Sequence, residues 1–397
     1  MNTTEQIKEK AAEYRDYTAE NLSRIVQIPS LSGEEEAVIA RLKTMLEEAG
    51  FDDVRIDGLG NLIGRVGYGP KTLAIDAHID TVDTGDLAQW ETDPFSGLVR
   101  GGLVLGRGTV DQKGGAASMI TGGRILKEMG YDGEYSVYFT FTIMEEDCDG
   151  LCWKYLIEAE KLVPDCVVIT EPTNLGLYRG HRGRMEMEVH FSGRSAHGSA
   201  PERGDNAIYK SCRAGLAIEA LHQRLKTDPF LGKGSIAVTY IASQSPSLCA
   251  IPDGCMMHLD RRLTWGETLE SAVQEVTAAI GEDARVIVPL YDRPSYRGTV
   301  FAQDKYFPTW KLAEDHPFVR AGAKTAALVL DEAPRVDKWV FSTNAVAICG
   351  RHGIPCIGFG PGNEVLAHAP NEHIPVDHLQ QASAFYALLP FVLEQPR

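Results

Sequence analysis

Acidic and histidine side chains gather at points where an apolar run of the sequence ends or a glycine-rich turn begins. They are His78-Ile-Asp80, Asp111 within Gly106–Gly115, Glu145-Glu146 and Glu171. Imidazole and carboxylate groups are ligands of catalytic divalent metal ions, and both can also transfer protons. Ligand sites in parallel α/β sheets collect outside the carboxyl ends of the strands, so we expect these groups to meet there.

Two of these groups have a spacing that suits a metal site. Residues two apart on an extended segment share a face, so Asp80 can accept one N–H of His78 and leave the other ring nitrogen for a metal. Glu145 and Glu146 repel each other at the tip of the apolar run Tyr135–Ile143, and a metal ion would supply the counter-charge. Adjacent side chains point in different directions, so one can coordinate while the other handles a proton. Taken singly, each pattern is also typical of a solvated, charged loop.

The other candidates are weaker when each is taken alone. Asp111 precedes a predicted helix, where a carboxylate also serves as an ordinary cap. The glycines around it match neither GxGxxG nor GxxxxGK[ST], so the turn is not a phosphate-binding loop. Glu171 precedes Pro172, which forces an extended exit from its strand, and His368 has the setting of a common loop histidine.

The elements that must position these residues alternate between strand and helix. Periodicity predicts helices at Glu5–Ile25, Glu34–Ala49, Ala116–Met129 and Val376–Leu393, and strands at Leu73–Asp80, Tyr135–Ile143, Asp165–Thr170 and Ile354–Phe359. This order predicts an α/β layer structure with much parallel sheet.

The pattern changes near Arg182, where Met185–Ser192 alternates apolar and polar residues like a strand with one solvated face. A helix, two strands and a second helix follow, at Asn206–Arg224, Ser235–Ala242, Cys255–Arg262 and Glu267–Ile280. This is a compact α+β unit, and the α/β pattern returns after Pro289. We therefore predict a discontinuous catalytic domain, residues 1–182 and 291–397, with a second domain inserted at 183–290.

The length and composition of the sequence exclude several classes of protein. With 397 residues, 44% hydrophobic and 24% charged, the chain is neither disordered nor a coiled coil, and its length predicts two domains. The net charge of -16 argues against nucleic acid and anionic membranes as partners. No window holds the roughly 18 consecutive apolar residues of a membrane helix, and we find no basic-then-apolar leader. Eight cysteines without a CxxC pair then predict reduced thiols and a cytoplasmic protein.

Taken jointly, the order His-x-Asp, Gly-rich Asp, Glu-Glu, Glu-Pro and His resembles a family of zinc-dependent exopeptidases and deacylases. That family includes acetylornithine deacetylase, succinyl-diaminopimelate desuccinylase, aminoacylase, peptidase T and glutamate carboxypeptidase. The resemblance extends from about Tyr17 to the end of the sequence and is closest to the selenium-metabolism-linked hydrolase subgroup. It implies a zinc-exopeptidase-like three-layer catalytic domain with an inserted ferredoxin-like lid that mediates dimerisation.

The resemblance also implies roles for single residues. Two zinc ions would share one bridging carboxylate, with His78 and Glu171 on one ion, Glu146 and His368 on the other, and Asp111 as the bridge. Asp80 would orient His78, Glu145 would act as general acid and base, and the peptide after Asp111 would be cis. Two Zn²⁺ bring four positive charges, which the three carboxylate ligands and a bridging hydroxide neutralise. Imidazole and carboxylate ligands without thiolate suit a catalytic zinc pair, with Co or Mn as the alternative metals.

The lid is expected to supply further groups. His197 matches the family's lid histidine, which reaches into the partner subunit's active site and stabilises the oxyanion; taken alone it is a loop histidine. Arg261 or Arg262 stands where relatives keep an arginine for the substrate carboxylate, which arginine binds in bidentate fashion. A salt-bridged surface pair is the alternative for both arginines.

Two positions depart from the family pattern. Cys249 precedes Ala-Ile-Pro where several relatives have a substrate-contacting Asn, and a thiol is a poor hydrogen-bond donor. Ser342-Thr-Asn344 stands where many relatives have Ser-Asp, which points to a different substrate side chain contacted by Asn344.

The main hypothesis is therefore a homodimeric amidohydrolase that cleaves a small N-acyl or N-carbamoyl amino acid. A dipeptidase or carboxypeptidase acting on short peptides is the alternative within the same chemistry. A catalytically silent, metal-dependent binding protein on the same scaffold is the rival from another class. A cysteine hydrolase is a remote option, because no cysteine has an evident histidine partner in the sequence.

Overall fold

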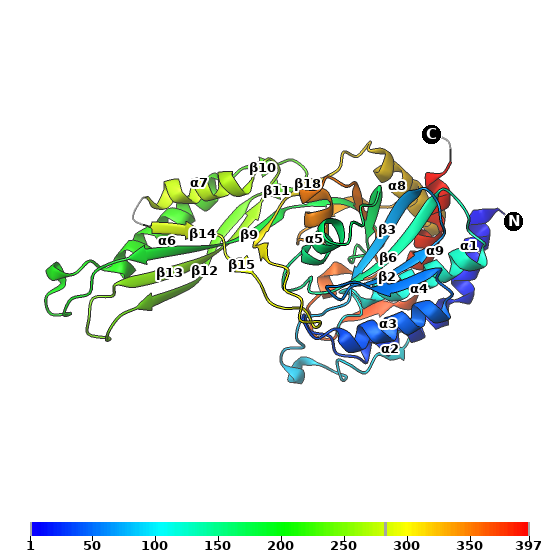
Figure 1. The fold of residues 1–397 in the computed structure, drawn as a ribbon, viewed down its shortest axis with the longest axis horizontal. Coiled ribbons are helices and arrows are strands. Elements are labelled where there is room, and N and C mark those ends of the chain that lie inside the picture. Colours follow the sequence, from blue (N-terminus) through cyan, green and yellow to red (C-terminus); the bar gives the residue numbers. More distant parts are fainter. Residues whose placement is uncertain (1, 282–283, 396–397) are drawn as a thin grey trace.

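A mixed sheet of nine strands forms the centre of the larger part of the molecule (Figure 1). The computed structural model describes residues 2–281 and 284–395. In spatial order the strands are β1 (Asp53–Ile56), β2 (Leu62–Val66), β6 (Tyr135–Thr142), β3 (Lys71–His78), β7 (Cys166–Ile169), β20 (Cys356–Gly358), β8 (Leu177–His181) and β18 (Trp310–Lys311), with β19 (Val336–Trp339) beside β8. Strands β6, β3, β7 and β20 run parallel, so their carboxyl ends meet at one edge of the sheet.

Helices pack against this sheet and against one another. They are α1 (Thr3–Glu13), α2 (Arg15–Val26), α3 (Glu36–Glu48), α4 (Lys113–Glu128), α5 (Leu151–Glu158), α8 (Pro317–Leu330) and α9 (Val376–Leu393). Helix α4 contacts β2, β3 and β6, and α9 packs against α1, α2, α4 and α8. Helix α5 packs against a π-helical segment at Val346–Arg351.

The sequence predicts one helix over Glu5–Ile25, but the structure has two. The backbone of Tyr14 leaves the helical conformation, with φ -90° and ψ 8°. The two helices then follow different partners, since α1 packs mainly on α9 while α2 packs on both α4 and α9. The Tyr14 hydroxyl is hydrogen-bonded to Glu128 at the end of α4, which holds the bend in place.

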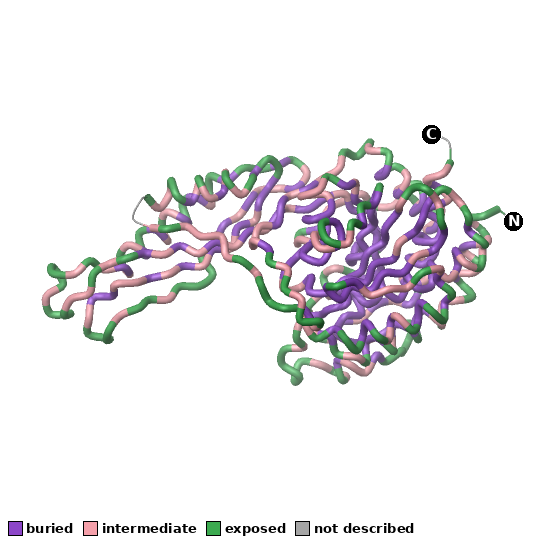
Figure 2. The backbone as a smooth tube through the Cα atoms, in the orientation of Figure 1, coloured by how far each residue is buried: buried purple, intermediate pink, exposed green. Residues whose placement is uncertain are grey.

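The inserted unit has its own sheet and its own apolar core. Its elements are β9 (Gly183–Ser192), α6 (Ala207–Arg224), β12 (Ser235–Gln244), β13 (Gly254–Leu263), α7 (Leu269–Ile280) and β14 (Ala284–Ile287), and the strand order β12-β13-β9-β14 is antiparallel throughout. Apolar residues of β9 and β13 face α6 and α7 and form a core separate from the main one (Figure 2). This unit projects from the side of the larger part, and we refer to it as the lid (Figure 1).

Short strands complete the fold: β4 (Leu98–Arg100), β5 (Leu103–Leu105), β10 (Thr227–Asp228), β11 (Gly232–Lys233), β15 (Leu290–Tyr291), β16 (Gln303–Asp304), β17 (Tyr306–Phe307) and β21 (His373–Pro375). Strand β17 pairs with β9 of the lid although it lies beyond residue 290. The predicted domain boundaries at 182 and 290 therefore stay predictions.

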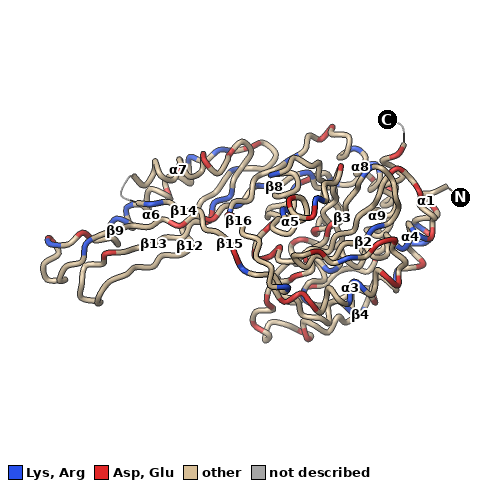
Figure 3. Tube along the Cα trace, in the orientation of Figure 1, with Lys and Arg blue, Asp and Glu red and all other residues tan. Residues whose placement is uncertain are grey.

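Acidic and basic residues are distributed over both parts of the molecule (Figure 3). All eight cysteines are free thiols. Within residues 2–281 and 284–395, none of the helices is both long and apolar enough to cross a bilayer.

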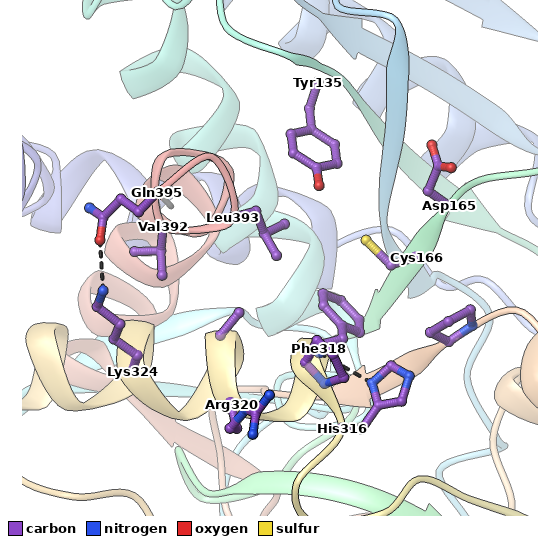
Figure 4. Close-up of a pocket in the computed structure, with 13 residues that line it drawn as sticks. Tyr135, Asp165, Cys166, His316, Phe318, Arg320, Lys324, Val392, Leu393 and Gln395 are labelled. Carbon is purple, nitrogen blue, oxygen red and sulfur yellow. Dashed lines mark hydrogen bonds between the residues drawn. The ribbon is translucent and has the colours of Figure 1, made fainter. Parts of the chain in front are cut away.

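A hollow of about 510 Å³ opens between β7, α8 and α9 (Figure 4). Because Tyr135 and Cys166 begin β6 and β7, this hollow lies at the amino edge of the sheet.

Candidate metal centre

The side chains predicted to bind metal come together at the carboxyl edge of the sheet. They come from three adjacent strands and two loops: His78 ends β3, Glu145 and Glu146 follow β6, Glu171 follows β7, Asp111 precedes α4, and His368 lies in the loop after β20. The strands deliver these groups to one place because β6, β3 and β7 are parallel neighbours.

Asp111 lies between the two imidazoles. Its Oδ1 is 2.9 Å from Nε2 of His78, and its Oδ2 is 3.2 Å from Nε2 of His368. The same nitrogen of His368 is 3.1 Å from Oε2 of Glu146, and that of His78 is 3.6 Å from Oε1 of Glu171. Each imidazole thus faces two carboxylates, and each oxygen of Asp111 faces a different imidazole.

The ligand atoms are clustered closely enough for metal binding. One atom each from His78, Glu145 and Glu171 lie within 4.8 Å of one another, and the same holds for His78, Asp111 and Glu146. Glu145 Oε1 and Glu171 Oε2 are buried without a hydrogen-bond partner among the residues described. Buried carboxylate oxygens without partners are costly, and divalent cations would satisfy them, so the donor set fits a metal pair.

Asp80 anchors the imidazole of His78 from behind. Nδ1 of His78 is 3.0 Å from the carbonyl oxygen of Asp80 and 3.4 Å from its Oδ1. A hydrogen bond at Nδ1 fixes the ring and leaves Nε2 directed at Asp111 and Glu171, as a metal ligand requires. The carboxylate of Asp80 also accepts the hydroxyl of Ser32 at 2.6 Å.

Glu372 holds the loop that carries Asp111. Its buried carboxylate accepts the backbone N–H groups of Gly108, Val110 and Asp111 at 2.7–3.1 Å. It also pairs with Arg107 at 2.7 Å, and Arg107 donates to the carbonyl oxygen of His368 at 3.3 Å. The peptide between Asp111 and Gln112 is cis, which confirms that prediction.

The carboxylates of the centre are held together against their mutual repulsion. Burial, with neighbouring carboxylates adding to it, raises the pKa of Glu145 and of Glu171 well above the usual range. Burial and the charge of Asp111 raise the pKa of Glu146 to about 7. Hydrogen bonds to Asp111 and Glu146 raise the pKa of His368 to about 10. These raised pKa values mean that protonation would relieve the excess negative charge, as a bound divalent cation would.

A cavity of about 350 Å³ opens over these groups, and the lid forms one of its walls. It is lined by Asp111, Glu145, Glu146, Asp149, Glu171, Arg184, Arg262, Phe341, Ser342, Glu364, Ala367 and His368. Acidic groups of the centre therefore face two arginines of the lid across a space that suits a small ligand.

Arg184 on β9 and Arg262 on β13 are direct cross-strand neighbours. Like charges at such positions repel each other. Acids offset the repulsion, since Arg184 lies 3.3 Å from Asp149 and 3.1 Å from Glu186, and Arg262 lies 2.8 Å from Asp260. The sequence analysis did not predict Arg184 as a cavity residue, although the alternation of apolar and polar residues places it on the polar face of its strand.

Arg261 does not reach the cavity, which corrects its prediction as a substrate contact. Its side chain is 0% exposed and is paired with Glu267 at 2.5 Å and Glu275 at 2.8 Å. Successive strand residues face opposite sides of a sheet. Arg262 faces the cavity, so Arg261 must face the helices of the lid.

Asn344 is also placed away from the cavity. It is 1% exposed, and its Nδ2 donates to Asp76 at 2.9 Å and to Thr142 at 3.1 Å. Its Oδ1 accepts the N–H of Gly150 at 3.0 Å. The predicted substrate contact is therefore wrong for the described arrangement, and its neighbour Ser342 lines the cavity instead.

His197 lies on an exposed lid loop outside the residues that line the cavity. Its Nδ1 accepts the hydroxyl hydrogen bond of Ser199 at 2.7 Å, and its backbone forms a bridge with Ala250. Within one chain it is not part of the centre. Its predicted action on a partner subunit stays a prediction.

Comparisons with known proteins agree with this geometry. The sequence matches the model of the peptidase family M20/M25/M40 over residues 74–390. It is 50% identical over 387 residues to the uncharacterized protein YgeY of Escherichia coli strain K12, covering 97% of this chain and 96% of YgeY. It is 27% identical over 379 residues to acetylornithine deacetylase of Klebsiella pneumoniae strain 342, covering 88% and 91% of the two chains.

The fold has known relatives as well. The YXEP protein of Bacillus subtilis, described as a dinuclear metal-binding peptidase of the M20 family, superimposes with a TM-score of 0.69. The two sequences are 16% identical, and the similarity covers 97% of this chain and 100% of the other. This likeness confirms the predicted fold class, a mixed α/β catalytic part with a separate small antiparallel sheet.

Proposed function

The chain belongs to the peptidase family M20/M25/M40, and from this membership we propose that it is a dinuclear metal-dependent amidohydrolase. The proposed substrate is a small N-acyl or N-carbamoyl amino acid. The observation that carries the proposal is the placement of Asp111. One of its carboxylate oxygens faces His78, and the other faces His368. A carboxylate between two imidazoles is the arrangement that a bridged pair of divalent ions needs.

Each residue of the centre has a proposed task. His78 and Glu171 would hold one ion, Glu146 and His368 the other, and Asp111 both. Zn is the proposed metal, with Co or Mn as alternatives. The bound metals supply Lewis acidity toward the scissile carbonyl and toward water. Glu145 lines the cavity, and its Oε1 has no hydrogen-bond partner among the described residues, so it can accept a proton from water and deliver it to the departing nitrogen.

Arg262 is the proposed partner of the substrate carboxylate. It lines the cavity from the lid side, opposite the metal ligands, and its guanidinium can bind a carboxylate through two parallel hydrogen bonds. If Arg262 binds the substrate carboxylate and the metal centre binds the scissile carbonyl, the amide bond would lie between Arg262 and Glu145.

We predict that Arg262→Ala affects substrate binding, whereas Arg261→Ala affects stability. Arg262→Ala should raise KM about 10- to 100-fold, the loss of about 1.5–3 kcal/mol from a charge-assisted contact. Arg261→Ala should leave KM unchanged but lower the free energy of unfolding by about 3–5 kcal/mol, because it leaves the buried carboxylate of Glu267 without its cationic partner. Steady-state kinetics and thermal unfolding of both variants check this. An unchanged KM in Arg262→Ala would remove that residue from the substrate site.

The proposed assembly is a homodimer formed through the lid. Strand β12 lies at the edge of the lid sheet, and its exposed residues include Tyr240 (58%) and Ile241 (50%). Leu216 on the neighbouring helix α6 is 68% exposed. An unpaired strand edge beside exposed apolar side chains is typical of a surface that a partner covers. Such a dimer supports the proposed role of His197 in the partner's cavity.

Mixing two inactive variants tests whether His197 acts across the dimer. We predict that His197→Ala and Glu145→Gln are each nearly inactive as homodimers. After subunit exchange at a 1:1 ratio, half of the dimers are mixed and each has one complete site, so about a quarter of the wild-type activity should return. If His197 acts within its own chain, both sites of a mixed dimer stay defective and mixing restores nothing.

A substrate panel tests the proposed function itself. Metal-loaded protein should hydrolyse N-acetyl, N-succinyl or N-carbamoyl amino acids in preference to dipeptides. Preference for dipeptides would favour a peptidase, and inactivity across the panel with bound metal would favour a silent binding protein. The family members named above include both deacylases and peptidases, so the panel separates the two proposed activities.

A further inference from the structure

A second buried carboxylate, that of Glu35, lies beside the point where the chain leaves β6. Glu35 is 0% exposed and precedes α3. Its Oε1 accepts the N–H of Gly33 at 2.9 Å and the N–H of Met144 at 3.1 Å. Its Oε2 is buried and has no hydrogen-bond partner in the part of the chain that the structure describes.

Met144 has an unusual backbone conformation. Its φ is 60°, in the left-handed region that a residue with a side chain rarely adopts, and it is 0% exposed. Such a conformation costs about 1–3 kcal/mol and persists only where the surroundings impose it. The hydrogen bond from its N–H to Glu35 is one such constraint.

The next two backbone groups are held in the same way. The N–H groups of Glu145 and Glu146 donate to the two carboxylate oxygens of Asp80, at 3.2 Å and 3.1 Å. Three successive N–H groups therefore end on two buried carboxylates. This arrangement sends the side chain of Glu146 to His368 and that of Glu145 into the cavity.

Burial of the Glu35 carboxyl group at this position is energetically unfavourable. Burial, followed by the charge of Asp80, raises its pKa to about 8. A buried carboxyl group with one oxygen unpartnered among the described residues contributes little to stability by itself. What it does provide is a fixed acceptor for the strained residue directly before Glu145.

We propose that Glu35 is a positioning residue for Glu145. By holding the N–H of Met144 it fixes the left-handed turn that aims Glu145 into the cavity. The inference rests on the proposed function insofar as Glu145 is the proton-transferring group. Its structural part, the immobilisation of residues 144–146, stands apart from any activity.

Glu35→Ala and Glu35→Gln test this role. Glu35→Ala should lower kcat about 10- to 100-fold, as loss of an outer support of a metal site does, with KM within about twofold of wild type and metal content unchanged. Glu35→Gln keeps an acceptor oxygen and should restore most of kcat. Asp228→Ala is the matched control, because one oxygen of this buried lid carboxylate also accepts two backbone N–H groups, at 2.9 Å and 2.8 Å. It should lower Tm without lowering kcat.

Hydrogen exchange followed by mass spectrometry gives a readout that needs no substrate. Amide exchange of residues 144–146 should be about tenfold faster in Glu35→Ala, the equivalent of one lost hydrogen bond, and unchanged in Asp228→Ala. Unchanged exchange, or a kcat equal to that of wild type, would overturn the inference. An inactive wild-type protein that still shows faster exchange in Glu35→Ala would instead defeat the proposed function alone.

Discussion

Glu145→Gln is expected to abolish nearly all turnover while both metal ions stay bound. General acid–base catalysis contributes about 10²- to 10⁴-fold to rate, and kcat should fall by that factor. The amide of Gln has nearly the shape of the carboxylate but cannot accept the proton. Glu145 is proposed to transfer that proton, while metal binding is proposed for His78, Asp111, Glu146, Glu171 and His368. Elemental analysis of the purified variant and steady-state kinetics measure the two properties separately.

Asp147→Asn is the matched control for this substitution. Asp147 lies two residues further in the same acidic loop but is paired with Arg293 at 2.7 Å and with Tyr291 at 3.0 Å, outside the cavity. Its removal should leave kcat within about twofold of wild type, since surface ion pairs contribute little. Unaltered turnover in Glu145→Gln, or equal losses in both variants, would contradict the assignment of Glu145.

Removal of metal is expected to abolish activity and to destabilise the folded chain. A ligand present at a thousand times its Kd stabilises the folded state by about 4 kcal/mol. Chelation should therefore lower Tm, and adding Zn, Mn or Co should restore both Tm and hydrolysis. Full activity after exhaustive chelation would contradict a metal-dependent mechanism.

The destabilisation should also grow with pH. The pKa of Glu146 is raised to about 7 and that of His368 to about 10. Without metal, the folded protein thus binds more protons than the unfolded chain between the ordinary and the raised pKa of each group. Its stability therefore falls as the pH rises through that window. Metal competes with these protons, so the difference in Tm between loaded and chelated protein should widen from about pH 5.5 to pH 8. A difference that narrows over this range would contradict the placement of these groups in one centre.

The sequence predicted the elements whose patterns are long or strictly periodic. Helix α9 has the predicted bounds Val376–Leu393, and the strands that end at or just before His78, Glu145 and Glu171 lie where apolar runs predicted them. These three residues could be grouped in advance because parallel strands must end at one edge. Strands such as β18 and β19 contain few residues each and exist through pairing with β8, so their local pattern was too short to detect.

Only some of the residues around the cavity could be placed from a short segment of sequence. Strand alternation alone separates Arg261 from Arg262, since Cys255, Met257 and Leu259 place odd-numbered residues on the apolar face. That signal was present in the sequence. The placement of Asn344 depends instead on Asp76, a buried partner 268 positions away. The pairing of Arg184 with Arg262 likewise depends on the register between β9 and β13, which no short segment reveals.

The two imidazoles of the centre differ greatly in access to solvent. The side chain of His78 is 1% exposed, whereas that of His368 is 53% exposed. An ion held by His368 would therefore exchange with the medium faster than an ion held by His78. The two ions would then differ in how quickly a chelator removes them, the one at His368 being lost first.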